Sequence, residues 1–298
     1  MQANKMKTPV IAGIGEILWD VIDSSEELGG APVNFAYHTG ALGAESYAIS
    51  TVGDDNRGRA ALSTLERQQM STDHITVIGG ATTGYVLAEV DDQGVASYTF
   101  PDDVAWDRLS IRQCTKELAA RLDAVCFGSL VQRSDISRKA VMDYLSLVRE
   151  DTLKVFDVNL RQHFYTEAII RSSLEVADVV KLNDEEIVHI ARMENLKGTA
   201  EAQLKALVER YELELAVLTC GGEGSLLVSA SEISKHTGRQ TDIVDTIGAG
   251  DSFTATVILG LLKGYTLDTI NDNANQVAAF VCSQKGAMPH LPERFRIF

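Results

Sequence analysis

The feature that most constrains the fold is a regular alternation of short apolar runs with amphipathic segments. Runs such as PVIAGIG at 9–15 are typical of buried strands. Segments such as ISRKAVMDYLSLVRE at 136–150 and TAEAQLKALVERY at 199–211 place apolar residues at helical spacing. This alternation predicts βαβ units, and therefore an α/β fold with a central, mostly parallel sheet and helices on both faces. The predicted strands are 9–15, 46–53, 123–129, 153–159, 177–183 and 214–220.

Two segments do not fit a parallel core. Residues 82–100 have alternating apolar positions on both sides of DDQG, which is typical of a hairpin, and LWDVIDS at 18–24 is another short β-like piece. We expect them to pair as a small antiparallel β lid formed by about 16–30 and 82–104. Such a lid over the strand ends would exclude water from a reaction. Two surface hairpins without a role are the alternative.

Charge and the amino-terminal residues limit the partners. The net charge is -15, so nucleic acid and anionic membranes are disfavoured as partners. The first apolar run is too short for a signal peptide core or a membrane span, so we expect a cytoplasmic protein.

The cysteines show no metal or disulfide pattern. None of the four lies in a CxxC pair, so reduced thiols are expected. They are Cys114, Cys126, Cys220 and Cys282.

Several common motifs are incomplete or absent. Gly13-x-Gly15 follows a strand, but Leu18 stands where a dinucleotide fingerprint has its third glycine. The chain has no Gly-Lys pair for a Walker loop, and neither HExxH nor GxSxG occurs. An oxidoreductase and a Walker-type enzyme are therefore disfavoured.

The segment DTIGAGDSF at 245–253 precedes an apolar helical pattern that stops at Gly264. Gly248, Ala249 and Gly250 then form a turn whose N–H groups lie at a helix N-terminus, where phosphate binds readily. Asp251 falls in the first turn, where it can act as a base or a hydrogen-bond acceptor, although an ordinary helix-capping role is the alternative.

DTIGAGDSF closely resembles the C-terminal signature of the PfkB or ribokinase-like family of sugar and nucleoside kinases. GGAPVNFAYHTGALG at 29–43 resembles the N-terminal signature of that family, and GEILWDVI and DVNLRQHFY look most like bacterial fructokinases. The resemblance spans nearly the whole chain. It implies a single ribokinase-like kinase domain over 1–298 that transfers the γ-phosphoryl group of ATP to a sugar hydroxyl, with fructose favoured. The same chemistry on 2-keto-3-deoxygluconate, ribose or a nucleoside, and a non-catalytic sugar-binding protein, are the alternatives.

The resemblance also implies catalytic roles. Gly248, Ala249 and Gly250 would form an anion hole for the migrating phosphoryl group, and Asp251 would take the proton of the attacking hydroxyl.

Ions are implied at two places. Glu186, with Asn183 in an N-x-x-E motif, would organise Mg²⁺ through water, although NDEE also makes a good helix start. A monovalent cation, such as K⁺, would be held by Asp245, the carbonyl of Ile247, Ser283 and Gly286.

The implied ligand contacts fall into two groups. Asp20, Gly29, Gly30, Asn34, Phe100 and Arg161 would bind the sugar, with Trp106 as a further wall. A salt bridge from Arg161 to Asp157 is the alternative for that arginine, and plain packing is the alternative for the aromatic residues. The residues implied to bind the nucleotide are Asn183, Thr219, Gly221, Gly224, Asn275 and Ala279. A hairpin turn is the alternative for the two glycines, and ordinary packing of small residues explains Asn275 and Ala279 nearly as well. Family members often pair through the lid, so a homodimer is expected.

Overall fold

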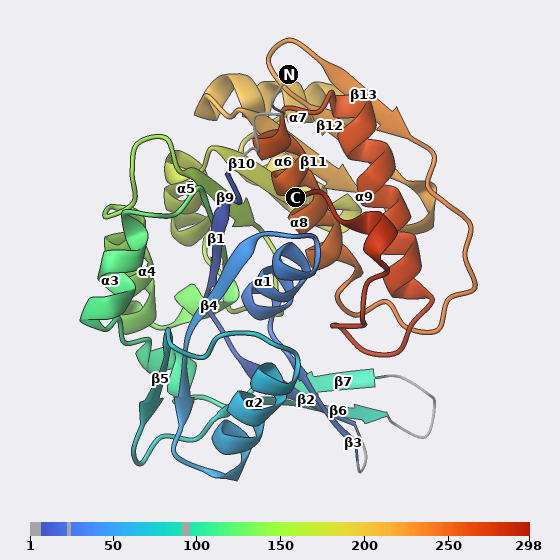
Figure 1. Ribbon diagram of the computed structural model, residues 1–298. Coiled ribbons are helices and arrows are strands. Elements are labelled where there is room, and N and C mark those ends of the chain that lie inside the picture. The colour runs from blue at the N-terminus through green and yellow to red at the C-terminus, as the bar shows by residue number, and fades with distance from the viewer. Residues whose placement is uncertain (1–6, 23–24, 91–95) are drawn as a thin grey trace.

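The computed structural model describes residues 7–22, 25–90 and 96–298 and has a large sheet at its centre (Figure 1). Its strands are β1 (Val10–Ile14), β4 (Glu45–Gly53), β5 (Ile75–Ile78), β8 (Ala124–Gly128), β9 (Leu153–Asp157), β10 (Val179–Asn183), β11 (Leu215–Thr219), β12 (Ser225–Val228) and β13 (Ile233–His236). Their order is β13-β12-β11-β10-β9-β8-β1-β4-β5. The six predicted strands are β1, β4 and β8 to β11, and they pair in parallel as expected.

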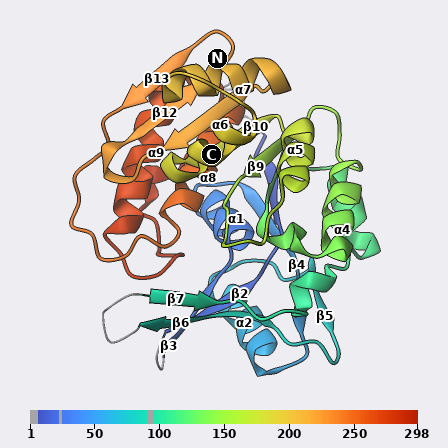
Figure 2. The same ribbon diagram turned by 180° about the vertical axis from the view of Figure 1, so that it is seen from behind.

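Most residues of β1 and of β8 to β11 are apolar because both faces of the sheet are covered there. Ile11 of β1 belongs to one buried core, while Ala12 and Ile14 belong to the other. The first core contains α1 (Ala31–Ala41), α8 (Ala249–Lys263) and α9 (Leu267–Cys282). The second face is covered by α3 (Gln113–Ala119), α4 (Asp135–Leu145), α5 (Glu167–Val176), α6 (Asp184–Met193) and α7 (Ala200–Tyr211), several of which face the viewer in Figure 2. The remaining helix, α2 (Asn56–Arg67), lies near β4 and the small sheet.

A second sheet lies at the bottom of Figure 1. It consists of β2 (Leu18–Ile22), β3 (Ser25–Gly29), β6 (Gly84–Val90) and β7 (Ala96–Thr99), in the order β3-β2-β6-β7. The predicted small sheet is confirmed, and the pairs β2–β3 and β6–β7 are antiparallel. The pairing between the two hairpins is parallel instead, because β2 and β6 leave the core sheet in the same direction, with Leu18 opposite Gly84. The predicted DDQG turn, at 91–94, lies outside the described residues.

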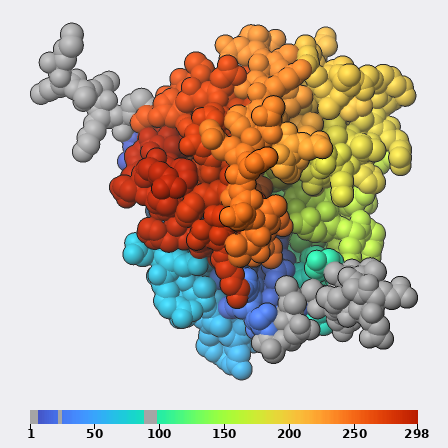
Figure 3. Space-filling view, turned by 90° about the vertical axis from the view of Figure 1, so that its right-hand side faces the viewer, coloured from blue at the N-terminus to red at the C-terminus, as the bar shows by residue number. Residues whose placement is uncertain are grey.

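Segments that are far apart in the sequence meet beside this small sheet. Figure 3 shows the C-terminal part, coloured orange to red, lying on residues of the first quarter, coloured blue and cyan. One contact between them is the ion pair of Lys285 with Glu27 of β3, at 3.2 Å. Within the described ranges, no helix is both long enough and apolar enough to cross a bilayer.

Candidate active site

The N-terminus of α8 is open. Gly248 is the N-cap with φ 79°, and no side chain caps the helix. Only glycine fits there, because a Cβ would lie 2.3 Å from the carbonyl oxygen of Ala287. The N–H of Ala249 donates to Thr246 over a long 3.3 Å. The N–H groups of Gly250 and Asp251 have no partner among the described residues, so they are free to bind an anion.

Asp251 projects from the first turn of α8 towards α1. The side-chain amide of Asn34 donates from Nδ2 to Oδ2 of Asp251 at 2.8 Å. Burial, with the nearby charge of Asp157, raises the pKa of Asp251 to about 6. The carboxylate is therefore ionised at neutral pH but close enough to its pKa to accept a proton, which suits a general base.

A cavity of ≈ 650 Å³, here called the lid cavity, opens in front of this helix end. It is bounded by the small sheet, by α1 and by the segment that follows β9. The predicted sugar-binding residues on its wall are Asp20, Gly30, Asn34, Phe100 and Arg161.

Two predicted residues do not line the lid cavity. Gly29 lies behind Asp20, because a Cβ at Gly29 would be 2.9 Å from Oδ2 of that aspartate. Trp106 is 1% exposed and packs in the core with the guanidinium of Arg133 at 4.1 Å from its ring, so its expected role as a wall is wrong.

A buried ion pair lies beneath the helix end. Nζ of Lys181, on β10, is 3.1 Å from Oδ1 of Asp157, on β9, and Thr254 of α8 donates to the other oxygen of Asp157 at 3.2 Å. Burial opposes the charge of Lys181, but Asp157, Glu186 and Asp251 outweigh it and raise the pKa of the lysine. Arg161 makes no ion pair with Asp157 within the described residues, so the alternative for Arg161 is wrong.

Sequence reasoning missed two charged residues of the lid cavity, Lys181 and Glu16. Each is a charged residue inside an otherwise apolar run, and this was the signal that could have found them. Glu16 is 2% exposed, and burial raises its pKa to about 7.

Asn183 and Glu186 also line the lid cavity, as partners in a capping box. Oδ1 of Asn183 accepts the N–H of Glu186 at 2.8 Å, and Oε2 of Glu186 accepts the N–H of Asn183 at 2.8 Å. The other oxygen of Glu186 accepts the N–H of Leu160 at 2.9 Å. The helix-start alternative therefore describes the geometry correctly. It leaves a fixed carboxylate on the cavity wall, with lone pairs that can still accept from water.

The four residues predicted to hold a monovalent cation lie on two adjacent segments. Asp245 accepts the N–H of Ile247 and the N–H of Gly286, each at 3.0 Å, which fastens the turn before α8 to the segment after α9. Ser283 donates to the carbonyl of Phe280 at 2.7 Å. No cluster of three or more His, Cys, Asp or Glu side chains suited to a metal occurs in the part of the chain that is described.

A second cavity, of ≈ 760 Å³, lies between the β11–β12 turn, residues 239–246 and α9, and is here called the C-terminal cavity. The predicted nucleotide residues on its wall are Thr219, Gly221, Gly224, Asn275 and Ala279. The hairpin alternative is also present, because β11 and β12 pair antiparallel around these glycines. The side-chain amide of Asn275 donates to the hydroxyl of Ser225 at 2.7 Å, and this bond orients the amide.

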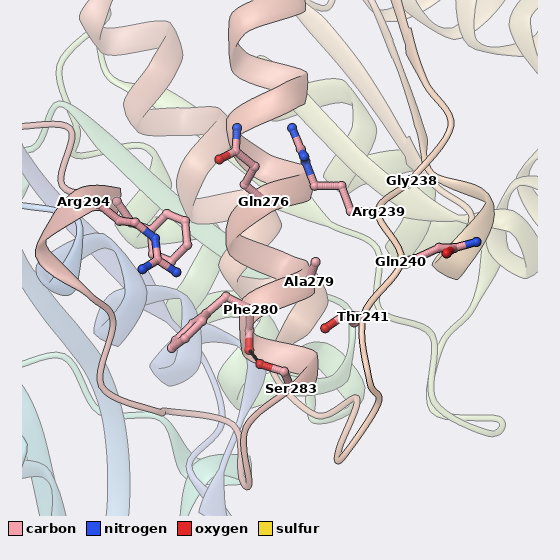
Figure 4. Close-up of a pocket in the computed structure, with 10 residues that line it drawn as sticks. Gly238, Arg239, Gln240, Thr241, Gln276, Ala279, Phe280, Ser283 and Arg294 are labelled. Carbon is pink, nitrogen blue, oxygen red and sulfur yellow. Dashed lines mark hydrogen bonds between the residues drawn. The ribbon is translucent and has the colours of Figure 1, made fainter.

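The two cavities meet at the start of α8, because Thr219, Thr246 and Gly250 line both. A shallower hollow of ≈ 550 Å³ adjoins the C-terminal cavity. In Figure 4 it spans α9, with Arg239 and Thr241 on one side and Arg294 on the other. Thr241 and Ala279 line both this hollow and the C-terminal cavity.

Comparison with known proteins agrees with this arrangement. The model of the pfkB family carbohydrate kinases matches residues 15–294, and the chain belongs to this family. Fructokinase from Salmonella typhimurium is 30% identical over 94% of this chain and 95% of that protein. The resemblance, the fold class and the enzyme class are thereby confirmed: the protein is a phosphotransferase with an alcohol group as acceptor.

Solved structures show the same fold. A sugar kinase from Pyrococcus horikoshii in complex with ATP has a TM-score of 0.80 and 28% identity, covering 93% of this chain and 94% of that one. A double mutant of fructokinase from Vibrio cholerae, bound to fructose, ADP and potassium ion, has a TM-score of 0.78 at 23% identity, covering 96% and 95%.

Proposed function

We propose that this kinase transfers the γ-phosphoryl group of ATP to a hydroxyl of a small sugar, with fructose as the acceptor. The observation that carries the proposal is that two cavities meet at an uncapped helix N-terminus beside Asp251. ATP would occupy the C-terminal cavity and the sugar the lid cavity. The relatives favour these ligands, because one is a fructokinase by name and the solved structures hold ATP in one case and fructose with ADP in the other.

The chain's own groups supply the parts that phosphoryl transfer requires. The carboxylate of Asp251, held by Asn34, takes the proton of the attacking hydroxyl. The free N–H groups of Gly250 and Asp251 stabilise negative charge on the migrating group, and the ammonium of Lys181 lies on the same cavity wall. The amide of Ala249, committed in part to Thr246, contributes less than expected.

The residues present fit the two expected ions. Glu186, with Asn183, would hold Mg²⁺ through water, and this ion would neutralise the phosphate oxygens of ATP. Asp245, the carbonyl of Ile247, Ser283 and Gly286 would hold K⁺, which would stabilise the turn before α8. We place the sugar against Asp20, Asn34, Arg161 and Phe100, with the small sheet acting as a lid on a single kinase domain.

The test is release of ADP, coupled to a dehydrogenase reaction, over a panel of sugars. Wild-type protein should turn over fructose faster than ribose, 2-keto-3-deoxygluconate or nucleosides. Asp251→Asn should lower kcat by about 10²–10⁴-fold with little change in ATP affinity, because it keeps the shape but not the base. Asp268→Asn, at the exposed first turn of α9, is the matched control and should keep the full rate. Near-normal turnover by Asp251→Asn would show that the base is another group.

A further inference from the structure

Glu16 occupies an unusual position between the two sheets. It lies in the short connection from β1, in the central sheet, to β2, in the small sheet. Its side chain is 2% exposed and forms part of the wall of the lid cavity. A carboxyl group so far from solvent is costly unless something binds it.

The chain satisfies only part of that carboxyl group. The backbone N–H groups of Glu16 and Ala31 stabilise its charge, and Arg161 does so from a greater distance. Oε2 has no hydrogen-bond partner among the described residues. On the same wall, Oδ1 of Asn34 is also buried without a described partner, although Nδ2 of the same amide holds Asp251.

The two oxygens specify the chemistry of a partner. The Asn34 oxygen can only accept a hydrogen bond, whereas a carboxyl group accepts when ionised and also donates when protonated. A sugar hydroxyl both donates and accepts, so it satisfies either group. A carboxylate or phosphate on the ligand could only accept, and it would add negative charge beside Glu16, Asp20 and Asp251.

The cations of the lid cavity do not reverse this preference. Lys181 is already paired with Asp157 and lies towards α8, where a Cβ at Gly250 would be 3.2 Å from its Nζ. Among the described residues that line the cavity, this leaves Arg161 as the cation for three acidic groups on the sugar side.

We propose that Glu16 binds a hydroxyl of the acceptor and selects uncharged sugars against sugar acids and sugar phosphates. This inference rests on the proposed function, because it assigns the sugar to the lid cavity. Glu16 would thus act on specificity, while Asp251 acts on the reacting hydroxyl.

Two substitutions and a set of deoxy sugars test the binding role. Glu16→Ala should raise KM for the sugar about tenfold with KM for ATP unchanged, whereas Glu16→Gln should remain within about threefold of wild type, since its amide also donates and accepts. One monodeoxy analogue should lose about tenfold in kcat/KM with wild type and nothing further with Glu16→Ala, because the contact is already missing. Glu26→Gln, an acidic lid residue outside the cavity, is the control.

Charge selection has a separate readout. The ratio of kcat/KM for fructose 6-phosphate or 2-keto-3-deoxygluconate to that for fructose should rise about tenfold in Glu16→Gln, because a like charge has been removed. An equal loss on every analogue, or equal changes in both KM values, would mean that Glu16 is only structural, with water as its partner. If wild type phosphorylates sugars and Glu16→Ala does so unchanged, this inference fails alone. If wild type phosphorylates none, the proposed function fails and this inference with it.

Discussion

At the scale of single residues, the lid cavity is lined by acidic side chains whose pKa values are raised by burial. Burial raises the pKa of Glu16 to about 7 and the pKa values of Asp20 and Asp251 to about 6. Groups whose pKa values move towards neutrality in a cleft are typical of sites that exchange protons or bind polar ligands. Each of these three carboxyl groups destabilises the folded chain when it is ionised. Such a cost is expected at a functional site, where the group binds a ligand.

The proposed role of Asp251 as general base predicts how activity depends on pH. A raised pKa means that Asp251 takes up its proton at a higher pH than a free aspartate, so kcat/KM for the sugar should fall about tenfold per pH unit below about 6. A stopped assay across about pH 5 to 8 measures this limb. Because burial also raises the pKa of Asp20 to about 6, Asp20→Asn provides the control. In this variant the fall of kcat/KM at low pH should persist, although KM for the sugar is raised. A flat profile would contradict Asp251 as the base.

Part of the site was predictable residue by residue. Gly248 and Asp251 stand out in the sequence because small residues and a lone acid precede an apolar helix, whereas Asn34 was predicted only from the resemblance to the family's N-terminal signature. Lys181 was missed because the partner that stabilises its charge is distant in the chain, and Glu16 was missed because the cavity that it lines forms only in the folded chain. Lys181 finds Asp157 only when β9 and β10 pair.

At the scale of elements, the start of α8 depends on one backbone conformation. Gly248 has φ 79°, and Asp245 fastens the preceding turn to Gly286. The helix end can remain uncapped because the turn is fixed by the carboxylate of Asp245, a side chain that lines neither cavity. The same feature leaves its N–H groups available.

Gly248→Ala tests this dependence. The new methyl group would lie 2.3 Å from the carbonyl oxygen of Ala287, and the alanine backbone would have to adopt a left-handed conformation. We therefore expect the free energy of unfolding to fall by about 2–3 kcal/mol and kcat to fall strongly. Urea unfolding and the ADP assay provide the two measurements. Gly79→Ala, where a Cβ meets nothing within 4 Å, should change neither. Normal activity of Gly248→Ala would exclude a fixed turn at this position.

The elements themselves were largely predictable, within limits that have physical causes. Buried strands were found because a continuous apolar run must lie between two covered faces. The helix predicted at 136–150 ends at Leu145, because Ser146 caps it and Leu147 is left exposed. The parallel pairing of β2 with β6 could not be predicted from local sequence, since it is set by where both strands leave the central sheet.

At the scale of the whole molecule, the proposed function assigns the two ligands to different parts of the chain. Sugar should slow amide hydrogen exchange at 16–20 and 159–162, and a non-hydrolysable ATP analogue should slow it at 219–224 and 239–246. Both should protect 248–251, which the cavities share. Mass spectrometry of peptides from each complex provides the measurement. Protection of both 16–20 and 219–224 by each ligand would mean that the two cavities are not separate sites.

The buried pair of Lys181 and Asp157 has a consequence for the reaction cycle. Because the ammonium of Lys181 is held by Asp157, which also accepts from Thr254 of α8, the proposed function needs no cationic side chain to move in from solvent in each turnover. Under the proposed function, this positive charge is therefore in place as soon as the sheet assembles, before ATP and the sugar bind.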